Sequence, residues 1–273
     1  MDDNTTPQTP LPDALLRAAV HAVEALARRA TVPFVVEKDD QAESVGTGTL
    51  FEIEGDHFIV TAEHVGRDIA RYELGVPCGP DRREIWFLGD GVVTKSEKYD
   101  VAVYRIDNPQ SVATLKQAWE FLTLDNIELS APTVDTNFLL HGYPTDLSPK
   151  TDDVIAAAPV AAVTTSYTGP TTNFPIAARP YDPRIDLLLN HPMRTVDLKT
   201  GAGVDAPDLR GISGCSVWTV ALPHQCDANQ VWSPRAAAKI VAVEASVRAG
   251  HWIRCTRWWA VADALNAMRK HTT

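Results

Sequence analysis

The sequence predicts a mostly β protein made of two lobes, with a helix near each end of the chain. Residues 34–106 contain short runs of β-branched and aromatic residues, such as "FVVEK", "HFIVTA" and "VAVYRI", and residues 136–255 contain a second set. Turn-forming sequences such as "EGD" and "GDG" separate the runs, and short strands at this spacing are typical of a barrel or a sandwich. Residues 108–131 break the pattern, so we expect them to form the crossing between the lobes.

Helical periodicity replaces strand periodicity at both ends. In residues 12–30 and 256–273, apolar side chains recur at every third or fourth position, which indicates amphipathic helices. The expected apolar positions are Leu15, Ala19, Val23 and Leu26 in the first helix and Trp258, Val261, Leu265 and Met268 in the second, with Thr256 as its N-cap. We expect both stripes to pack on the protein core, and docking of a partner on the first helix is the alternative.

Composition narrows the class of protein. The 273 residues are 45% hydrophobic and 22% charged, which suffices for a core and a soluble surface. The formal net charge of −10 argues against nucleic-acid binding, which needs a basic surface. No stretch is long and apolar enough for a membrane span, and the start "MDDNTTPQTP" does not resemble a secretory signal. The cysteines Cys78, Cys215, Cys226 and Cys255 form no CxxC pair, so we expect a cytoplasmic protein with reduced thiols and without a metal or nucleotide cofactor.

Three polar residues stand next to predicted strands in a pattern that suits acyl transfer. His64 follows the apolar run "IVTA", Asp100 precedes "VAVYRI", and Ser213 lies within "RGISGCSVW". A serine hydroxyl is a poor nucleophile at neutral pH and needs a neighbouring base, usually a histidine that a carboxylate orients. Backbone N–H groups must also face the developing oxyanion, and Gly211 can adopt the backbone angles that allow this.

The order of these residues in the chain restricts the choice of hydrolase fold. An α/β-hydrolase needs Gly-x-Ser-x-Gly followed by an acid and then a histidine, and a subtilisin-like order begins with aspartate. Here the histidine comes first and the serine last, and Cys215 stands where the second glycine of that motif would be. Taken singly, Asp100 could merely terminate a strand and Ser213 could be a turn residue in a Gly-rich loop, so these structural roles stay open.

Four segments in the right order resemble a known family. "VGTGTLFEI" is similar to the family's Gly-x-Gly-Phe strand, "IVTAEHV" to its Thr-Ala-x-His segment, "YDVAVYRI" to its Asp-Ile-Ala-Leu strand and "RGISGCSVW" to its Gly-x-Ser-Gly-Gly loop, while "LLHGYP" resembles the start of its second barrel. The chain thus resembles a trypsin-like (chymotrypsin-fold) serine peptidase of the intracellular bacterial kind over residues 45–220. The resemblance implies two six-stranded antiparallel β-barrels. The implied parts are an N-terminal tail and helix (1–30), the first barrel (31–125), the second barrel (126–255) and a C-terminal helix (256–273).

The resemblance also implies a role for each of the three residues. His64 would be the general base, Asp100 would hold its tautomer and Ser213 would attack, while the N–H groups of Gly211 and Ser213 would form the oxyanion hole. The implied function is a serine endopeptidase that cleaves protein or peptide substrates through an acyl-enzyme and needs no cofactor or metal. The alternative is a catalytically silent peptidase-fold module for binding or sensing.

Two departures from the family pattern bear on activity. Cys215 replaces the second glycine after the nucleophile, and attack by Cys215 or Ser216 instead of Ser213 would require a shift of the loop. Ile212 stands where secreted relatives carry an aspartate that receives a freed N-terminus, and no Ile-Val-Gly-Gly start is present. We therefore hypothesise an enzyme that stays latent until a protein partner or a signal orders the oxyanion hole.

The resemblance places the primary substrate pocket just before the nucleophile and along a later strand. The candidate substrate-binding residues are Pro207, Asp208, Glu244, Ala245, Ser246 and Val247. Asp208 or Glu244 could attract a basic side chain, and Val247, at a position where many relatives have glycine, would shorten the pocket. We expect a small or a basic residue before the cleaved bond.

Overall fold

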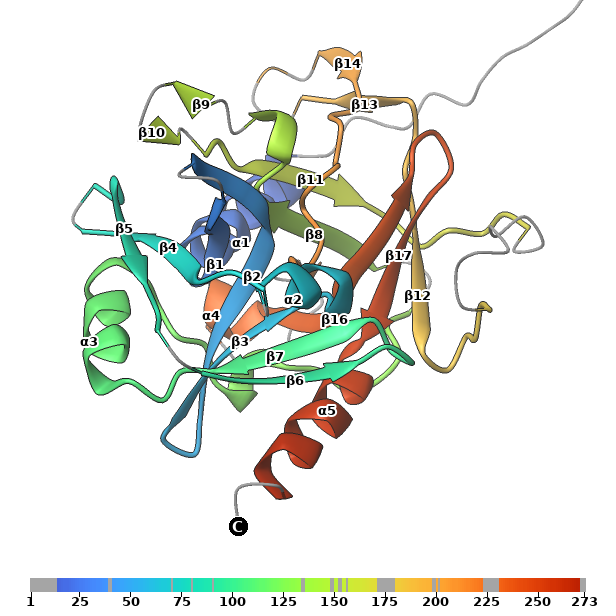
Figure 1. The fold of residues 1–273 in the computed structure, drawn as a ribbon. Helices are drawn as coiled ribbons and strands as arrows, with labels where there is room; N and C mark the ends of the chain where they lie inside the picture. Colours follow the sequence, from blue (N-terminus) through green and yellow to red (C-terminus); the bar gives the residue numbers. More distant parts are fainter. Residues whose placement is uncertain are drawn as a thin grey trace, which may run out of the picture.

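The computed structural model describes most of the chain, and Figure 1 gives its arrangement. The described residues are 14–38, 41–69, 71–79, 81–89, 91–133, 136–147, 150–151, 154–155, 157–170, 180–197, 200, 202–222 and 231–270. Within these ranges the chain folds into two large antiparallel sheets, two short hairpins and five α-helices, so the predicted mostly β class is confirmed. The thiols of Cys78, Cys215 and Cys255 are buried and free, and Cys226 lies outside the described residues.

The first sheet is built from the first set of predicted strands. It has seven strands in the order β5-β4-β1-β2-β3-β7-β6. Their bounds are β1 (Thr31–Lys38), β2 (Gln41–Ile53), β3 (Asp56–Thr61), β4 (Leu74–Cys78), β5 (Glu84–Phe87), β6 (Val92–Ser96) and β7 (Val101–Arg105). The turn between β2 and β3 consists of Glu54 and Gly55, whose positive φ angles of 54° and 88° suit a two-residue hairpin.

The second sheet has six strands in the order β11-β8-β15-β16-β17-β12. Their bounds are β8 (Asn137–Gly142), β11 (Val160–Thr164), β12 (Asp186–Asn190), β15 (Ser216–Val220), β16 (Ala238–Arg248) and β17 (Trp252–Arg257). An antiparallel bridge between Ser166, just beyond β11, and Leu189 of β12 brings the two outer strands together. The short hairpins are β9 (Lys150–Thr151) with β10 (Val154–Ile155), and β13 (Arg194–Val196) with β14 (Gly203–Asp205). The second sheet thus has six strands and the first has seven, so the implied pair of six-stranded barrels is not confirmed.

Helices lie at the ends and edges of the sheets. Their bounds are α1 (Ala14–Ala30), α2 (Glu63–Ile69), α3 (Pro109–Ala118), α4 (Pro234–Ala237) and α5 (Trp258–Lys270), with 3-10 turns at Leu124–Asn126 and Thr145–Leu147. α3 lies within the predicted crossing. Asn108 caps it by accepting a hydrogen bond of 2.8 Å from the N–H of Gln110, and Pro109 suits the first helical position.

The terminal helices differ from the prediction in two details. Leu15 is 44% exposed because it lies one turn before the first buried residue of α1, and Val20 and Ala27 complete the buried face instead. Thr256 does not cap α5, because strand pairing continues through it opposite Val243 and its hydroxyl donates to the buried Tyr99 carbonyl at 2.5 Å. The helix therefore begins at Trp258.

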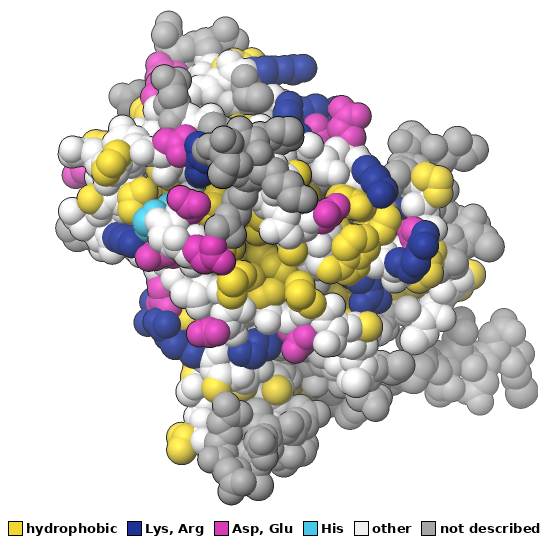
Figure 2. Space-filling model, turned by 90° about the horizontal axis from the view of Figure 1, so that it is seen from below, with side chains coloured by type: hydrophobic (Ala, Val, Ile, Leu, Met, Phe, Trp, Pro, Cys, Tyr) yellow, Lys and Arg dark blue, Asp and Glu magenta, His cyan; other side chains and the backbone are white. Residues whose placement is uncertain are grey.

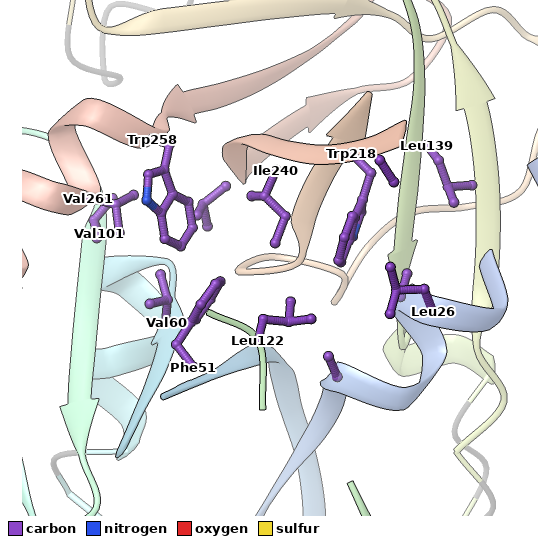
Figure 3. Packing of buried hydrophobic residues seen from close by; sticks show 14 of the residues in the cluster. Leu26, Phe51, Val60, Val101, Leu122, Leu139, Trp218, Ile240, Trp258 and Val261 are labelled. Carbon is purple, nitrogen blue, oxygen red and sulfur yellow. The ribbon is translucent and has the colours of Figure 1, made fainter. Parts of the chain in front are cut away.

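One hydrophobic core joins the two sheets and the terminal helices. In Figure 3, Phe51 and Val60 of the first sheet lie next to Trp258 of α5, and Ile240 of the second sheet lies opposite Leu122 in the same cluster. The rings of Phe51 and Trp258 are 4.8 Å apart at their centroids. Burial of such large apolar side chains is the main source of stability, so the two sheets are fixed relative to each other at this contact. The predicted core positions Val261 and Leu265 of α5 are buried here too, and the side chain of Met268 lies outside the described part.

One face of the molecule carries positively and negatively charged side chains side by side. Figure 2 shows Lys and Arg side chains interspersed with Asp and Glu around an apolar area on this face. Among the described residues, no helix has both the length and the apolar character needed to cross a membrane. No group of three or more His, Cys, Asp or Glu side chains in the same part of the chain is arranged to hold a metal ion.

Candidate active site

His64 lies in the first turn of α2, where the chain leaves β3. The strand ends at Thr61, whose hydroxyl donates to the Thr47 carbonyl of β2 at 2.7 Å. Ala62 is buried beneath the turn, and the His64 side chain is 38% exposed. This anchoring fixes the backbone that carries the imidazole and leaves one edge of the ring open to solvent.

Asp100 lies at the start of β7 and holds both the helix and the imidazole. Its Oδ1 accepts hydrogen bonds from the N–H groups of Glu63 and His64 at 3.0 and 3.3 Å. The same oxygen is 3.1 Å from His64 Nδ1. Because an ionised carboxylate only accepts, Nδ1 must carry the proton, and Nε2 is then the unprotonated nitrogen. Asp100 adopts a positive φ of 51°, which aspartate tolerates better than most residues.

The electrostatics of the pair follow from this geometry. Burial opposes the charged imidazole, but the hydrogen bond and the negative charge of Asp100 outweigh it and raise the pKa of His64 above its ordinary value. Burial also opposes the charge of Asp100, but the bonds from His64 and from the two N–H groups hold the pKa of Asp100 below its usual range. A histidine so oriented can take up a proton and be stabilised once charged.

Ser213 lies in the loop that precedes β15. Three amides of this loop are bonded within the fold: that of Ile212 to the Leu209 carbonyl at 3.2 Å, that of Gly214 to the Glu244 carbonyl at 2.9 Å, and that of Cys215 to the Ile212 carbonyl at 2.9 Å. Among the described residues, the N–H groups of Gly211 and Ser213 have no acceptor. The two free amides are therefore available to an oxygen atom of a bound molecule.

Gly211 is held in a conformation that only glycine fits. Its φ is +92°, and a Cβ here would lie 2.1 Å from the Thr145 hydroxyl oxygen. The preceding carbonyl, that of Arg210, accepts a hydrogen bond from the Thr145 N–H at 3.0 Å. Since C=O and N–H point in opposite directions across a trans peptide, the Gly211 N–H faces away from Thr145.

Thr47 of β2 joins the loop to the first sheet and was not among the site residues predicted from the sequence. Its N–H donates to the Ser213 carbonyl at 3.1 Å. Its buried hydroxyl accepts from the N–H of Tyr143 at 3.0 Å and lies 3.5 Å from the Gly211 carbonyl. A small hydroxyl residue between the two glycines of "VGTGT" was the available signal, because glycines there permit close approach of another backbone.

His64, Asp100, Ser213 and Gly211 line one cleft, of about 560 Å³. Side chains of α2 and of the turn between β6 and β7 line one side of it, and side chains of β16 and β17 line the other, so it lies between the parts of the chain that carry the two sheets. Among the described residues, no hydrogen bond joins the Ser213 hydroxyl to His64. The structure therefore brings the three side chains to one cleft and leaves the serine hydroxyl free to turn.

The other two candidate nucleophiles lie away from the cleft. Cys215 is fully buried, and burial with the nearby charge of Glu244 raises the pKa of its thiol well above the ordinary value. Ser216 is also fully buried, and its hydroxyl donates to the Thr49 hydroxyl at 2.8 Å. Neither group can meet a substrate without a rearrangement of the loop.

The predicted substrate-binding residues separate into two groups. Ala245, Ser246 and Val247 of β16 line the cleft. Pro207 and Asp208 precede the lining residue Leu209, and the exposed Asp208 carboxylate pairs with Arg210 at 2.7 Å. Hydrogen bonds from Arg210 lower the pKa of Asp208, so this acid already has a cationic partner. Glu244 is fully buried and forms no part of the cleft surface, so it differs from a pocket acid that is open to a substrate side chain.

Two solved structures resemble the chain. The Rv3671c protease, in an inactive form, has a TM-score of 0.53 at 13% sequence identity, with 94% of this chain and 96% of that chain covered. A structure from a study of coupled folding and binding of the intrinsically disordered Sesbania mosaic virus VPg protein has a TM-score of 0.45 at 16% identity, with 85% and 89% covered. No protein-family model and no curated protein matches the chain. At such identity the first likeness shows the fold alone, which is chymotrypsin-like and shared with a protease.

Proposed function

We propose that the protein is a serine endopeptidase with the triad His64, Asp100 and Ser213. The observation that carries the proposal is the cleft that these side chains share with two N–H groups lacking any described acceptor. The neighbouring amides of the loop are bonded within the fold, whereas the two N–H groups beside the candidate nucleophile are free, as an oxyanion hole requires. Strand β16 runs along the same cleft and offers a surface on which an extended peptide can lie.

The proposed reaction follows from the positions of the groups. His64 Nε2 removes the proton of the Ser213 hydroxyl as Oγ attacks the peptide carbonyl carbon, and the oxyanion accepts hydrogen bonds from Gly211 and Ser213. The imidazolium then gives its proton to the leaving amine, and an acyl-enzyme remains. Water attacks the acyl group with His64 again acting as base, which releases the acid and restores Ser213. Asp100 stays ionised throughout and stabilises the charged imidazole.

The packing of the loop supports an oxyanion hole that needs no activating partner. The Arg210 carbonyl is held by Thr145, and a flip of this peptide would break that bond and turn the Gly211 N–H toward Thr145. We therefore infer that purified protein reacts on its own. If a lysate of the source organism strongly increased its activity, the hypothesis of an activating partner would be favoured instead.

A fluorophosphonate probe tests the proposed nucleophile. The purified wild type should become labelled, because an activated serine attacks phosphorus as it attacks a carbonyl. Labelling should disappear in Ser213→Ala and in His64→Ala, and persist in Ser130→Ala, which removes an exposed serine elsewhere. Labelled protein digested to peptides should carry the adduct on Ser213. Absence of labelling in folded wild type would favour the silent binding module.

The size of the pocket is tested at Val247, which lines the cleft and pairs with Ile253 of β17. The β-branched side chain of Val247 narrows the cleft, so we propose a preference for a small residue before the cleaved bond. Val247→Gly should raise kcat/KM for peptides with Phe at that position by about tenfold or more relative to peptides with Ala. Val231→Gly, at a position that is 88% exposed, is the control. An unchanged Phe-to-Ala ratio in the Val247 variant would place the pocket elsewhere.

A further inference from the structure

Glu244 is bonded through its backbone to the loop that carries the proposed nucleophile. It belongs to β16 and immediately precedes Ala245, which lines the cleft. Its N–H donates to the Cys215 carbonyl and its carbonyl accepts from the Gly214 N–H, both at 2.9 Å. The backbone of Glu244 is thus bound to the two residues that follow Ser213, and the distance between strand and loop is fixed.

The side chain of Glu244 has no evident structural role. It is 0% exposed, and neither carboxyl oxygen has a hydrogen bond among the described residues. Its neighbours along β16, Val243 and Ala245, are apolar, and Cys255 lies opposite it on β17. A buried polar group without a partner costs free energy, so an apolar residue would serve packing better at this position.

The groups that affect the charge of this carboxyl include those of the proposed reaction. The pKa of Glu244 responds to the His64 imidazole, the Asp100 carboxylate and the Ser213 hydroxyl. On the core side it influences the thiols of Cys215 and Cys255. The Ser213 hydroxyl is close enough to affect the titration of Glu244, although it completes no hydrogen bond of normal geometry with it.

We propose that Glu244 is a positioning residue whose protonation state decides whether the Ser213 hydroxyl is offered to His64. The proposal rests on the proposed function. A neutral carboxyl can donate its O–H to a lone pair of Ser213 Oγ, so that the proton of Ser213 remains available to His64 Nε2. An ionised carboxylate can only accept, so it competes with His64 for the proton of Ser213 and turns the hydroxyl away.

The charge of an ionised Glu244 would act in the same direction. It would stabilise the imidazolium and so reduce the fraction of His64 that is a neutral base. Burial raises the pKa of Glu244 to about 8, with the His64 charge and the Ser213 hydroxyl opposing this and the Asp100 charge adding to it. We therefore expect Glu244 to be mostly neutral at pH 7 and to become charged in weakly alkaline solution.

The rate of inactivation by a fluorophosphonate, measured from pH 6 to pH 10, tests the proposal. In the wild type the rate should rise as His64 loses its proton and then fall by about tenfold or more above the pKa of Glu244. In Glu244→Gln the alkaline fall should be absent, because the amide N–H donates to Ser213 Oγ at every pH. Glu73→Gln, which removes an exposed carboxylate elsewhere, should keep the alkaline fall.

The outcomes separate this inference from the proposed function. A wild type whose rate stays level to pH 10, or a Glu244→Gln variant with the same fall as wild type, would overturn the role of Glu244 alone. A folded wild type that is not labelled at any pH would overturn both proposals.

Infrared difference spectra of wild type against Glu244→Gln add a readout without activity: the band of a protonated carboxyl should be present at pH 6.5 and lost by about pH 9.5. If Glu244→Gln fails to fold, the presence or absence of this band in wild type, with Glu244→Leu as the reference, still decides the protonation state.

Discussion

Replacing Asp100 by Asn is expected to lower kcat for peptide hydrolysis by about 10³–10⁴-fold with little change in KM. The asparagine oxygen can still accept from the N–H groups of Glu63 and His64, so α2 keeps its start. The neutral amide, however, has no charge to stabilise the imidazolium that forms when His64 takes the proton of Ser213, so the transition state loses that stabilisation.

The pH dependence provides the sharper measurement for Asp100→Asn. In the wild type, kcat/KM should fall as pH falls through the raised pKa of His64, because protonated His64 is not a base. Without the Asp100 charge the pKa of His64 drops, so this acid limb should move to lower pH. Asp107→Asn, in which an exposed carboxylate paired with Arg105 is changed, should leave both kcat and the acid limb as they were. A loss of less than about tenfold in Asp100→Asn would mean that the carboxylate only supports the backbone.

Local patterns made much of the fold predictable. The alternation of runs such as "HFIVTA" with turn sequences indicated short strands, and the strands β3 and β7 lie where those runs are. The helical periodicity of residues 12–30 likewise corresponds to α1, because an apolar stripe can be buried only if the helix packs on the body. These features depend on neighbours within a few positions, which one sequence displays directly.

The features that depend on distant pairing were not predictable. Thr256 resembles a helix cap in sequence, but its strand pairing opposite Val243 overrides this preference. Asp208 resembles a pocket acid until Arg210 is seen to bind it, and Glu244 resembles a pocket acid until its complete burial is seen. The environment of a charged side chain is set by residues far away in the chain, and it decides whether that charge is available to a ligand.

Replacing Arg254 by Met is expected to lower the free energy of unfolding by about 3–5 kcal/mol. Arg254 of β17 forms an ion pair with Asp186 of β12, at 3.0 Å through Nε and 2.8 Å through Nη2, and it also donates to the Pro180 carbonyl at 2.9 Å. The two side chains are only 3% and 0% exposed. Methionine fills much of the volume but leaves the Asp186 carboxylate buried without its cationic partner, and that uncompensated charge is the source of the loss.

A matched exposed pair isolates the contribution of burial. Arg184 pairs with Asp182 at 2.7 Å but is 84% exposed, so Arg184→Met should cost no more than about 1 kcal/mol in urea unfolding. Removing the charge from both partners in Asp186→Asn/Arg254→Met should recover part of the loss, because no lone charge then remains buried. Arg254 also lines the cleft together with Val247, so the buried pair supports the wall on which substrate would lie. Equal losses for the two single arginine variants would show that the buried pair contributes no more than a surface contact, and the wall must then be held by strand pairing alone.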